Sequence, residues 1–191
     1  MRFKASDTTL LEYLNLPRLL LSLPMNQVTT NHTTREAWLQ DGVRHLEPIF
    51  AKAGYVIPPV RVSCGFPASS SPRTTLGQCW PRDRSGGGVN EIFVSPKLDN
   101  PVELLDTLLH ELCHAVDDCH SGHGEDFKGI CQSVGLIGPA RMAHASEELQ
   151  VRLMTIAQKL GPYPHHAIVF PPPRASNLSR NKATCPQCGY E

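Results

Sequence analysis

His110-Glu-Leu-Cys-His114 is followed nine residues later by His123-Gly-Glu-Asp-Phe127, and these two stretches decide the fold that the sequence predicts. Residues four apart on an α-helix lie about 40° apart around its axis, so the imidazoles of His110 and His114 can reach one metal ion. Glu111 lies between them and can reach a water molecule beside that ion. This H-E-x-x-H spacing is typical of zinc peptidases, in which the two histidines bind zinc and the glutamate is the general base.

The helix that carries this motif is predicted independently of it. Asn100 is a good N-cap, Pro101 suits the first helical position, and Glu103 completes a capping box. A broad apolar face follows at helical spacing, formed by Leu105, Leu108, Leu109, Leu112 and Val116. Both histidines lie off the centre of this face, so the sequence predicts metal ligands on a rigid and largely buried helix.

A catalytic zinc site needs three protein ligands and one open position, so the third ligand must come from outside this helix. His123 lies between two glycines and directly before a second amphipathic segment that begins near Phe127. His120 has the spacing of a longer zinc-binding signature, but Asp117 stands where that signature requires glycine. We therefore favour His123 as the third ligand and keep His120 as the alternative.

At these residues the chain resembles the SprT-like (Spartan-like) family of zinc metalloproteases. Members of that family carry H-E-x-x-H on one helix and the third histidine in an H-G-x-x-F element that opens the next, here His123, Gly124 and Phe127. The resemblance extends from about Thr33 to Cys188 and is to the short phage and bacterial type. It implies an α+β, zincin-like metalloprotease domain whose helices pack on a small, mostly antiparallel sheet, and an endopeptidase whose substrates are DNA-associated proteins.

Outside the metal helix, the pattern predicts a helix from a Thr33 and Glu36 capping box to Gly54, and a last helix that begins after Ser146. Three strands are predicted between the first two helices, at residues 60–64, 76–80 and 91–95. The glycine-rich turn at residues 83–88 favours a hairpin of the last two strands. The resemblance implies that a sheet edge beside the metal pairs with an extended substrate, and the sequence leaves open which strand is that edge.

Three further side chains are candidates for supporting roles. Asp117 and Asp118 lie on the side of the helix that carries His114, so either carboxylate could orient a zinc ligand, although acidic residues at a helix end are as often simply solvated. Tyr163 resembles a position in the short family members and could donate to the oxyanion of the reaction, although a rigid proline turn is the simpler interpretation. Cys119 is predicted to be a buried or unreactive thiol.

The chain divides into an N-terminal extension at residues 1–32, a metalloprotease domain at residues 33–170, and a proline-rich linker with an incomplete zinc ribbon at residues 171–191. Cys185 and Cys188 form one C-x-x-C knuckle, but a structural zinc needs four ligands and no second knuckle follows. The segment before them is basic, with Arg174, Arg180 and Lys182. We expect any contact with DNA to be made here.

Composition limits the other function classes. The formal net charge of zero over 191 residues argues against a globally basic nucleic-acid binder, so contact with nucleic acid must be local. Seven cysteines, scattered through predicted helices and strands, do not form the pattern of a secreted disulfide framework. No apolar run approaches the roughly 18 residues of a membrane span. We expect a cytoplasmic protein that has no membrane partner.

The leading functional hypothesis is a zinc-dependent endopeptidase with His110, His114 and His123 as ligands and Glu111 as general base. A second hypothesis keeps the peptidase but gives it one regulatory protein target and no nucleic acid. A third is a nucleic-acid-binding module whose zinc is only structural. Glu111 argues against the third hypothesis, because a closed structural site has no use for a base at that position.

Overall fold

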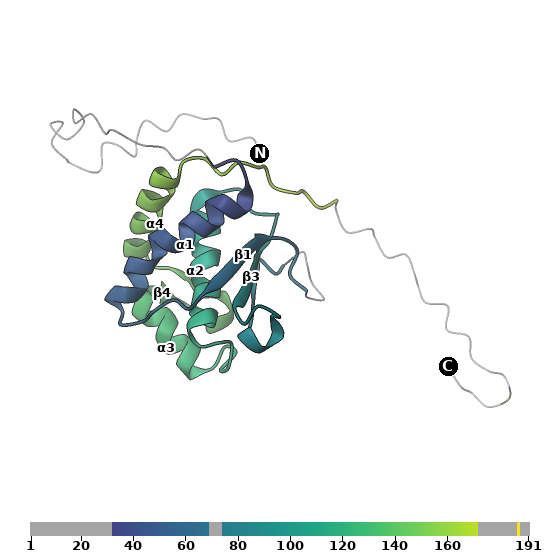
Figure 1. The fold of residues 1–191 in the computed structure, drawn as a ribbon, viewed down its shortest axis with the longest axis vertical. Helices are drawn as coiled ribbons and strands as arrows, with labels where there is room; N and C mark the ends of the chain where they lie inside the picture. Colours follow the sequence, from purple (N-terminus) through teal and green to yellow (C-terminus); the bar gives the residue numbers. More distant parts are fainter. Residues whose placement is uncertain (1–31, 69–73, 172–186, 188–191) are drawn as a thin grey trace.

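The computed structural model of this chain describes residues 32–68, 74–171 and 187, which form an α+β fold (Figure 1). The helices in these residues are α1 (Arg35–Lys52), α2 (Pro101–Val116), α3 (Glu125–Val134) and α4 (Glu147–Leu160), with short 3-10 helices at Arg82–Arg84 and Ala140–Met142. The strands are β1 (Val60–Cys64), β2 (Gly77–Trp80), β3 (Asn90–Val94), β4 (Leu136–Ile137) and β5 (His144–Ala145). No helix in this part of the chain has the length and apolar character of a membrane span.

The helix that carries the histidine motif, α2, is the centre of the fold. The side chain of Asn100 accepts hydrogen bonds from the amides of Val102 and Glu103, at 2.9 and 3.2 Å, and Pro101 occupies the first turn, as predicted. Five leucines of α2 are fully buried, at positions 104, 105, 108, 109 and 112. The helix contacts α1, α3, α4, β2, β3 and β5, and Figure 1 shows it between α4 and the strands. Its histidines are therefore held on an element that is fixed from several sides.

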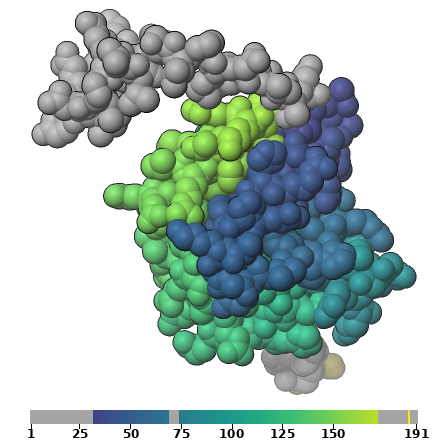
Figure 2. Space-filling view, turned by 60° about the vertical axis from the view of Figure 1, so that its left-hand side comes forward, coloured from purple at the N-terminus to yellow at the C-terminus, as the bar shows by residue number. Residues whose placement is uncertain are grey.

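Helices α1 and α4 pack against each other and against α2, and Figure 2 shows them side by side on one face. Ser146 caps α4 as predicted, accepting from the amide of Leu149. The predicted cap of α1 is wrong by one residue, because Thr34 rather than Thr33 accepts from the amide of Ala37. Glu36 is thus too early in the helix to complete a capping box, and its carboxylate instead accepts from the amide of Cys64.

The main sheet has the strand order β1-β3-β2. Strands β2 and β3 are antiparallel, which confirms the predicted hairpin, whereas β1 and β3 are parallel. The expected mostly antiparallel sheet is therefore a mixed one. The physical reason is the strand order. Strands β1 and β2 run in opposite directions, but β3 lies between them, so they do not pair with each other. Strand β3 therefore pairs in parallel with β1 and antiparallel with β2. This order makes β2 the edge strand beside α2, which the sequence had left open.

Candidate metal centre

Three histidines from two segments meet at one point. His110 and His114 come from α2, and His123 comes from the turn between α2 and α3. Their ligand nitrogen atoms all lie within 4.8 Å of one another. Among the residues that the structure describes, this is the one group of histidine, cysteine or carboxylate side chains close enough to hold a metal ion. Imidazole nitrogen is a common ligand for zinc, copper, iron and nickel, so the side chains present fit a transition-metal ion.

An ordered turn brings His123 back to the helix. Asp117 accepts hydrogen bonds from the amide and the hydroxyl of Ser121, and that hydroxyl accepts from the amide of Phe127 at 3.2 Å. The fully buried ring of Phe127 then stacks on the ring of His114, with ring centroids 3.9 Å apart and planes at 17°. The turn therefore fixes the position of His123, and the stacked ring of Phe127 fixes the orientation of the His114 imidazole.

Burial keeps the imidazoles neutral. Burial is the largest cause, and together with the charges of neighbouring histidines it lowers the pKa of His110 to about 4 and the pKa of His114 to about 3. Burial also lowers the pKa of His123, and the positive charge of Arg141 adds to this effect. The backbone of Ala143 beside the His110 ring acts in the opposite direction on the pKa of His110.

Glu111 lies beside the histidines and is 6% exposed. The pKa of its carboxyl is raised to about 8, mainly by burial and also by the nearby Cys119 thiol, against the opposing effect of the Cys79 backbone amide. Strand β2 passes unusually close at Gly77, where an added Cβ would lie 2.5 Å from the Glu111 Oε1 atom. The sequence carries a signal for this contact that was not used above, because an isolated glycine in a strand often marks a close approach of the backbone.

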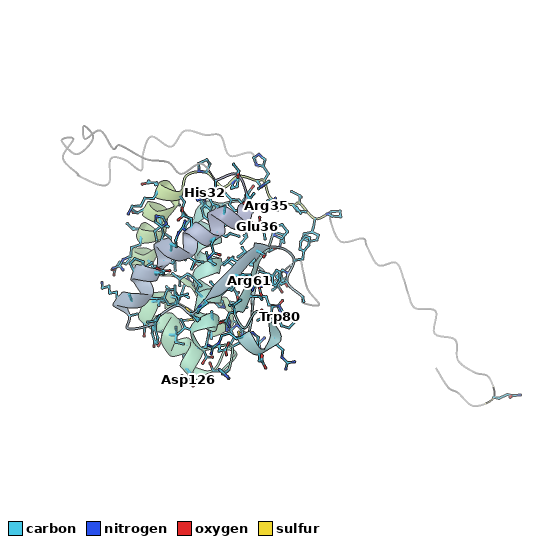
Figure 3. All side chains as sticks on the ribbon, in the orientation of Figure 1. His32, Arg35, Glu36, Arg61, Trp80 and Asp126 are labelled. Carbon is cyan, nitrogen blue, oxygen red and sulfur yellow. The ribbon has the colours of Figure 1, made fainter. Side chains whose placement is uncertain are left out.

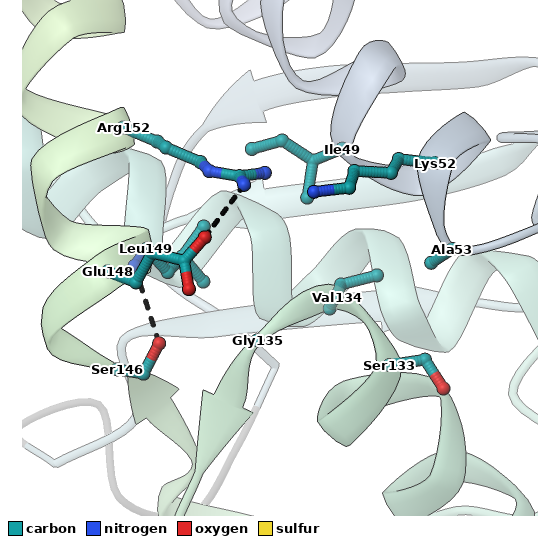
Figure 4. A pocket seen from close by; sticks show the side chains of 10 residues that line it. All are labelled: Ile49, Lys52, Ala53, Ser133, Val134, Gly135, Ser146, Glu148, Leu149 and Arg152. Atoms are coloured by element: carbon teal, nitrogen blue, oxygen red, sulfur yellow. Dashed lines mark hydrogen bonds and ion pairs between the residues drawn. The ribbon is translucent and has the colours of Figure 1, made fainter.

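The three histidines and Glu111 line a cavity of about 760 Å³. Its lining includes the segment from Thr74 to Cys79, which contains the β2 edge, and the segment from Arg141 to His144. A smaller cavity of about 210 Å³ lies elsewhere, between α1, α3 and α4, where the Arg152 and Glu148 side chains form an ion pair (Figure 4). It contains none of the predicted site residues, so the larger cavity is the candidate functional site.

The model of the SprT-like family matches residues 53–149, which include α2, α3, the three strands of the main sheet and all three histidines. The chain belongs to the SprT-like family. Neither the search of curated proteins nor that of solved structures found a match to the chain. Membership of the SprT-like family suggests a metallopeptidase-like role for this protein.

The other predicted site residues of this SprT-like protein lie apart from the three-histidine cluster. His120 is exposed, and its Nδ1 atom lies 2.8 Å from the backbone carbonyl of Asp117. Asp118 accepts from the backbone amide of Arg82 and the side chain of Asn90, at 3.0 and 2.8 Å. The carboxylates of Asp117 and Asp118 thus accept from other groups and not from the ring of a ligand histidine.

Tyr163 is not placed for the predicted oxyanion role. Its buried ring packs edge-on against Trp38, with centroids 5.3 Å apart, and its hydroxyl faces Cys64. It does not line the cavity of the three histidines. The simpler interpretation, a rigid segment that packs on the domain, therefore describes it better. Cys185 and Cys188 lie outside the residues that the structure describes.

Proposed function

We propose that this SprT-like protein is a zinc-dependent endopeptidase with a zincin-like catalytic centre. His110, His114 and His123 would hold the zinc ion. The observation that carries the proposal is that three neutral imidazoles converge within 4.8 Å beside a buried carboxylate in the wall of one cavity. A bound zinc ion supplies a Lewis acid that polarises a carbonyl group and lowers the pKa of water.

Glu111 is the general base in this proposal. Burial raises its pKa in the metal-free site, and the positive charge of a bound zinc ion would favour the ionised form. The carboxylate then accepts a proton from the water that attacks the scissile carbonyl, and returns that proton to the leaving amine. The backbone amide of Cys79 holds the carboxylate from the β2 side, and the backbone of Gly77 leaves it room. A purely structural zinc site would need neither an open cavity nor a carboxyl group buried next to the ligands. These features therefore favour the enzyme over the structural alternative.

The test of this function is the Glu111→Gln variant. Glutamine keeps the size of the side chain and removes the base, so hydrolysis of a cleavable protein should fall by about 100-fold or more. Zinc content and folding should be unchanged, because all three histidines remain. Glu103→Gln is the matched control, since Glu103 is an exposed residue in the first turn of the same helix. A Glu111→Gln protein that cleaves at the wild-type rate, or that has lost its zinc, would refute the assignment.

We also propose that the substrates are proteins bound to DNA. Two features support this: the resemblance to the short SprT-like proteases, and the basic residues before the C-x-x-C knuckle, in a segment outside the described residues. Cleavage of a DNA-bound protein should then accelerate when duplex DNA is added, and the acceleration should weaken as salt increases. Neutralising the segment with Arg174→Gln, Arg180→Gln and Lys182→Gln should remove the acceleration but leave the DNA-independent rate intact. Equal rates with and without DNA would favour the regulatory peptidase.

A further inference from the structure

Two thiols that the proposed hydrolysis does not use lie beside Glu111. Cys79 belongs to the β2 edge and Cys119 to the turn after α2, and both line the cavity of the three histidines. The Cys119 Sγ atom donates to the Cys79 carbonyl oxygen at 3.6 Å, although the two residues are 40 positions apart in the sequence. The Cys79 Sγ atom in turn donates to the carbonyl oxygen of Trp80 at 3.8 Å. The fold therefore brings the two thiol-bearing residues together at the cavity wall.

The turn holds Cys119 in this position through a specific backbone conformation. Asp118 and Cys119 have φ angles of 50° and 60°, in the left-handed region that side chains with a Cβ rarely adopt. The amide of Cys119 donates to the carbonyl of His114 at 2.8 Å, and the Asp118 carboxylate accepts from Arg82 and Asn90. These bonds fix both ends of the turn, so the Cys119 thiol is held against β2.

A second pair of thiols provides an internal contrast. Cys113 on α2 and Cys131 on α3 also contact each other, but they are 0% and 2% exposed and do not line the cavity. Cys79 and Cys119 are both partly exposed and open to the cavity. A dissolved oxidant can therefore reach the Cys79 and Cys119 pair while the native fold covers the other pair.

We propose that Cys79 and Cys119 form a redox-active pair, which hydrogen peroxide converts reversibly into a disulfide. The reacting form of a thiol is its thiolate. The Cys119 thiolate attacks one peroxide oxygen, the O–O bond breaks, and the leaving hydroxide takes up the proton that the thiol lost and becomes water, which gives a sulfenic acid. The Cys79 sulfur then attacks the Cys119 sulfur, and the S–O bond breaks to release a second water. Two thiols have lost two electrons and two protons, and one peroxide has become two waters.

The disulfide would connect β2 to the turn after α2 directly next to the proposed base. The backbone amide of Cys79 is the group that holds the Glu111 carboxylate, so the bond fixes this amide to the helix that carries Glu111 and two of the histidines. A dithiol reductant supplies the two electrons and two protons that restore both thiols. The bond itself is independent of the proposed hydrolysis, so its test does not rely on proteolytic activity.

The test is peptide mapping of the full chain after exposure to increasing hydrogen peroxide. Remaining thiols are alkylated, and the unreduced digest is analysed by mass spectrometry. We expect a peptide linked through Cys79 and Cys119, lighter by two hydrogens than its parts, which appears before any link through Cys113 and disappears with dithiothreitol. Cys79→Ser and Cys119→Ser should each abolish it, and Cys113→Ser should keep it. Recovery of alkylated Cys79 and Cys119 after the other thiols have reacted would overturn the proposal, as would irreversible oxidation of Cys119 without linkage to Cys79.

Discussion

Burial shifts the pKa of the acid and the pKa values of the bases in the metal centre in opposite directions. It raises the pKa of Glu111 to about 8 and lowers those of His110 and His114 to about 4 and 3. Both shifts favour the uncharged form, because a charge is costly in a poorly hydrated environment. A site made of neutral groups can accept a divalent cation without first losing protons from its imidazoles. The centre is therefore ready to bind a metal at neutral pH.

At the same scale, the choice of third ligand can be tested with two histidine variants. His123→Ala should reduce zinc affinity by at least about 100-fold, because even the outer partners of metal ligands change affinity by about 10- to 100-fold. His120→Ala should have little effect, since its ring contacts the Asp117 carbonyl instead of the other two histidines. Competition with a chromogenic chelator measures both affinities. The assignment fails if the His120 variant loses zinc while the His123 variant retains it.

At the scale of elements, local sequence signals predicted α2 and α4 well. The caps at Asn100 and Ser146 and the motif spacing depend only on residues a few positions apart, and the structure confirms both caps. The β2 and β3 hairpin was predictable for the same reason, because a short glycine-rich turn joins its strands. The motif spacing also predicted His123 as a ligand candidate, and the structure places its ring beside those of His110 and His114.

What the sequence could not predict depends on contacts between distant segments. The parallel pairing of β1 with β3 follows from how the strands are ordered in space, which no local pattern records. The backbone of Ala143 lies beside the ring of His110, and a backbone group is one that every residue type carries. Tyr163 is only a candidate from its position in a family segment, with a rigid proline turn as the simpler interpretation, and its aromatic ring packs against Trp38 on α1.

The approach of β2 to α2 leads to a prediction for Gly77. In Gly77→Ala, the new Cβ would lie 2.5 Å from Glu111 Oε1 and 2.7 Å from Glu111 Cγ, so the base must move. Displacement of a catalytic group by about 1 Å can reduce the rate by about 100-fold, and we expect kcat/KM to fall by at least about 10-fold. Zinc content should not change, because no ligand is touched.

Gly86→Ala is the matched control for this prediction. A Cβ at Gly86 would meet no atom within 4 Å, so both turnover and thermal stability should stay at wild-type values. Steady-state kinetics and thermal melting of the two variants separate a local effect on Glu111 from general unfolding. If Gly77→Ala hydrolyses substrate as fast as Gly86→Ala, β2 does not position the base.

At the scale of the whole molecule, the folding unit is larger than the segment that defines the family. The family match begins at residue 53, after α1 has ended. Four residues of α1 are nevertheless fully buried, namely Trp38, Leu39, Leu46 and Phe50. They belong to the same hydrophobic core as the leucines of α2. The metal centre therefore depends on the packing of α1, although no residue of α1 belongs to the centre.

A buried charge anchors α1 and gives the whole fold a pH dependence. Asp41 is 6% exposed, and its carboxylate lies 2.8 Å from the Arg44 guanidinium and 3.0 Å from the ring of His32, a residue just before α1 that Figure 3 labels. Burial alone would raise the pKa of Asp41, but the hydrogen bonds from Arg44 and His32 outweigh it and hold the pKa below its ordinary value of 3.8. The folded state thus binds this proton less readily than the unfolded state.

This linkage predicts how Asp41→Asn changes stability with pH. Because the pKa is lower in the folded state, the carboxylate contributes its stabilisation fully above pH 3.8 and loses it as the pH falls through the lowered folded value. At pH 7 the variant should therefore be less stable by roughly 1 to 3 kcal/mol, the usual scale for hydrogen bonds to a charged group. Below pH 3.8 the difference from wild type should shrink, since the wild-type carboxyl is then increasingly protonated.

Urea denaturation at pH 7 and at a pH below 3.8 measures the difference in the free energy of unfolding. The control is Asp126→Asn, at an exposed residue of α3, which should show no such change. An Asp41→Asn penalty that is the same at both pH values would show that packing of the side chain, rather than its charge, stabilises α1.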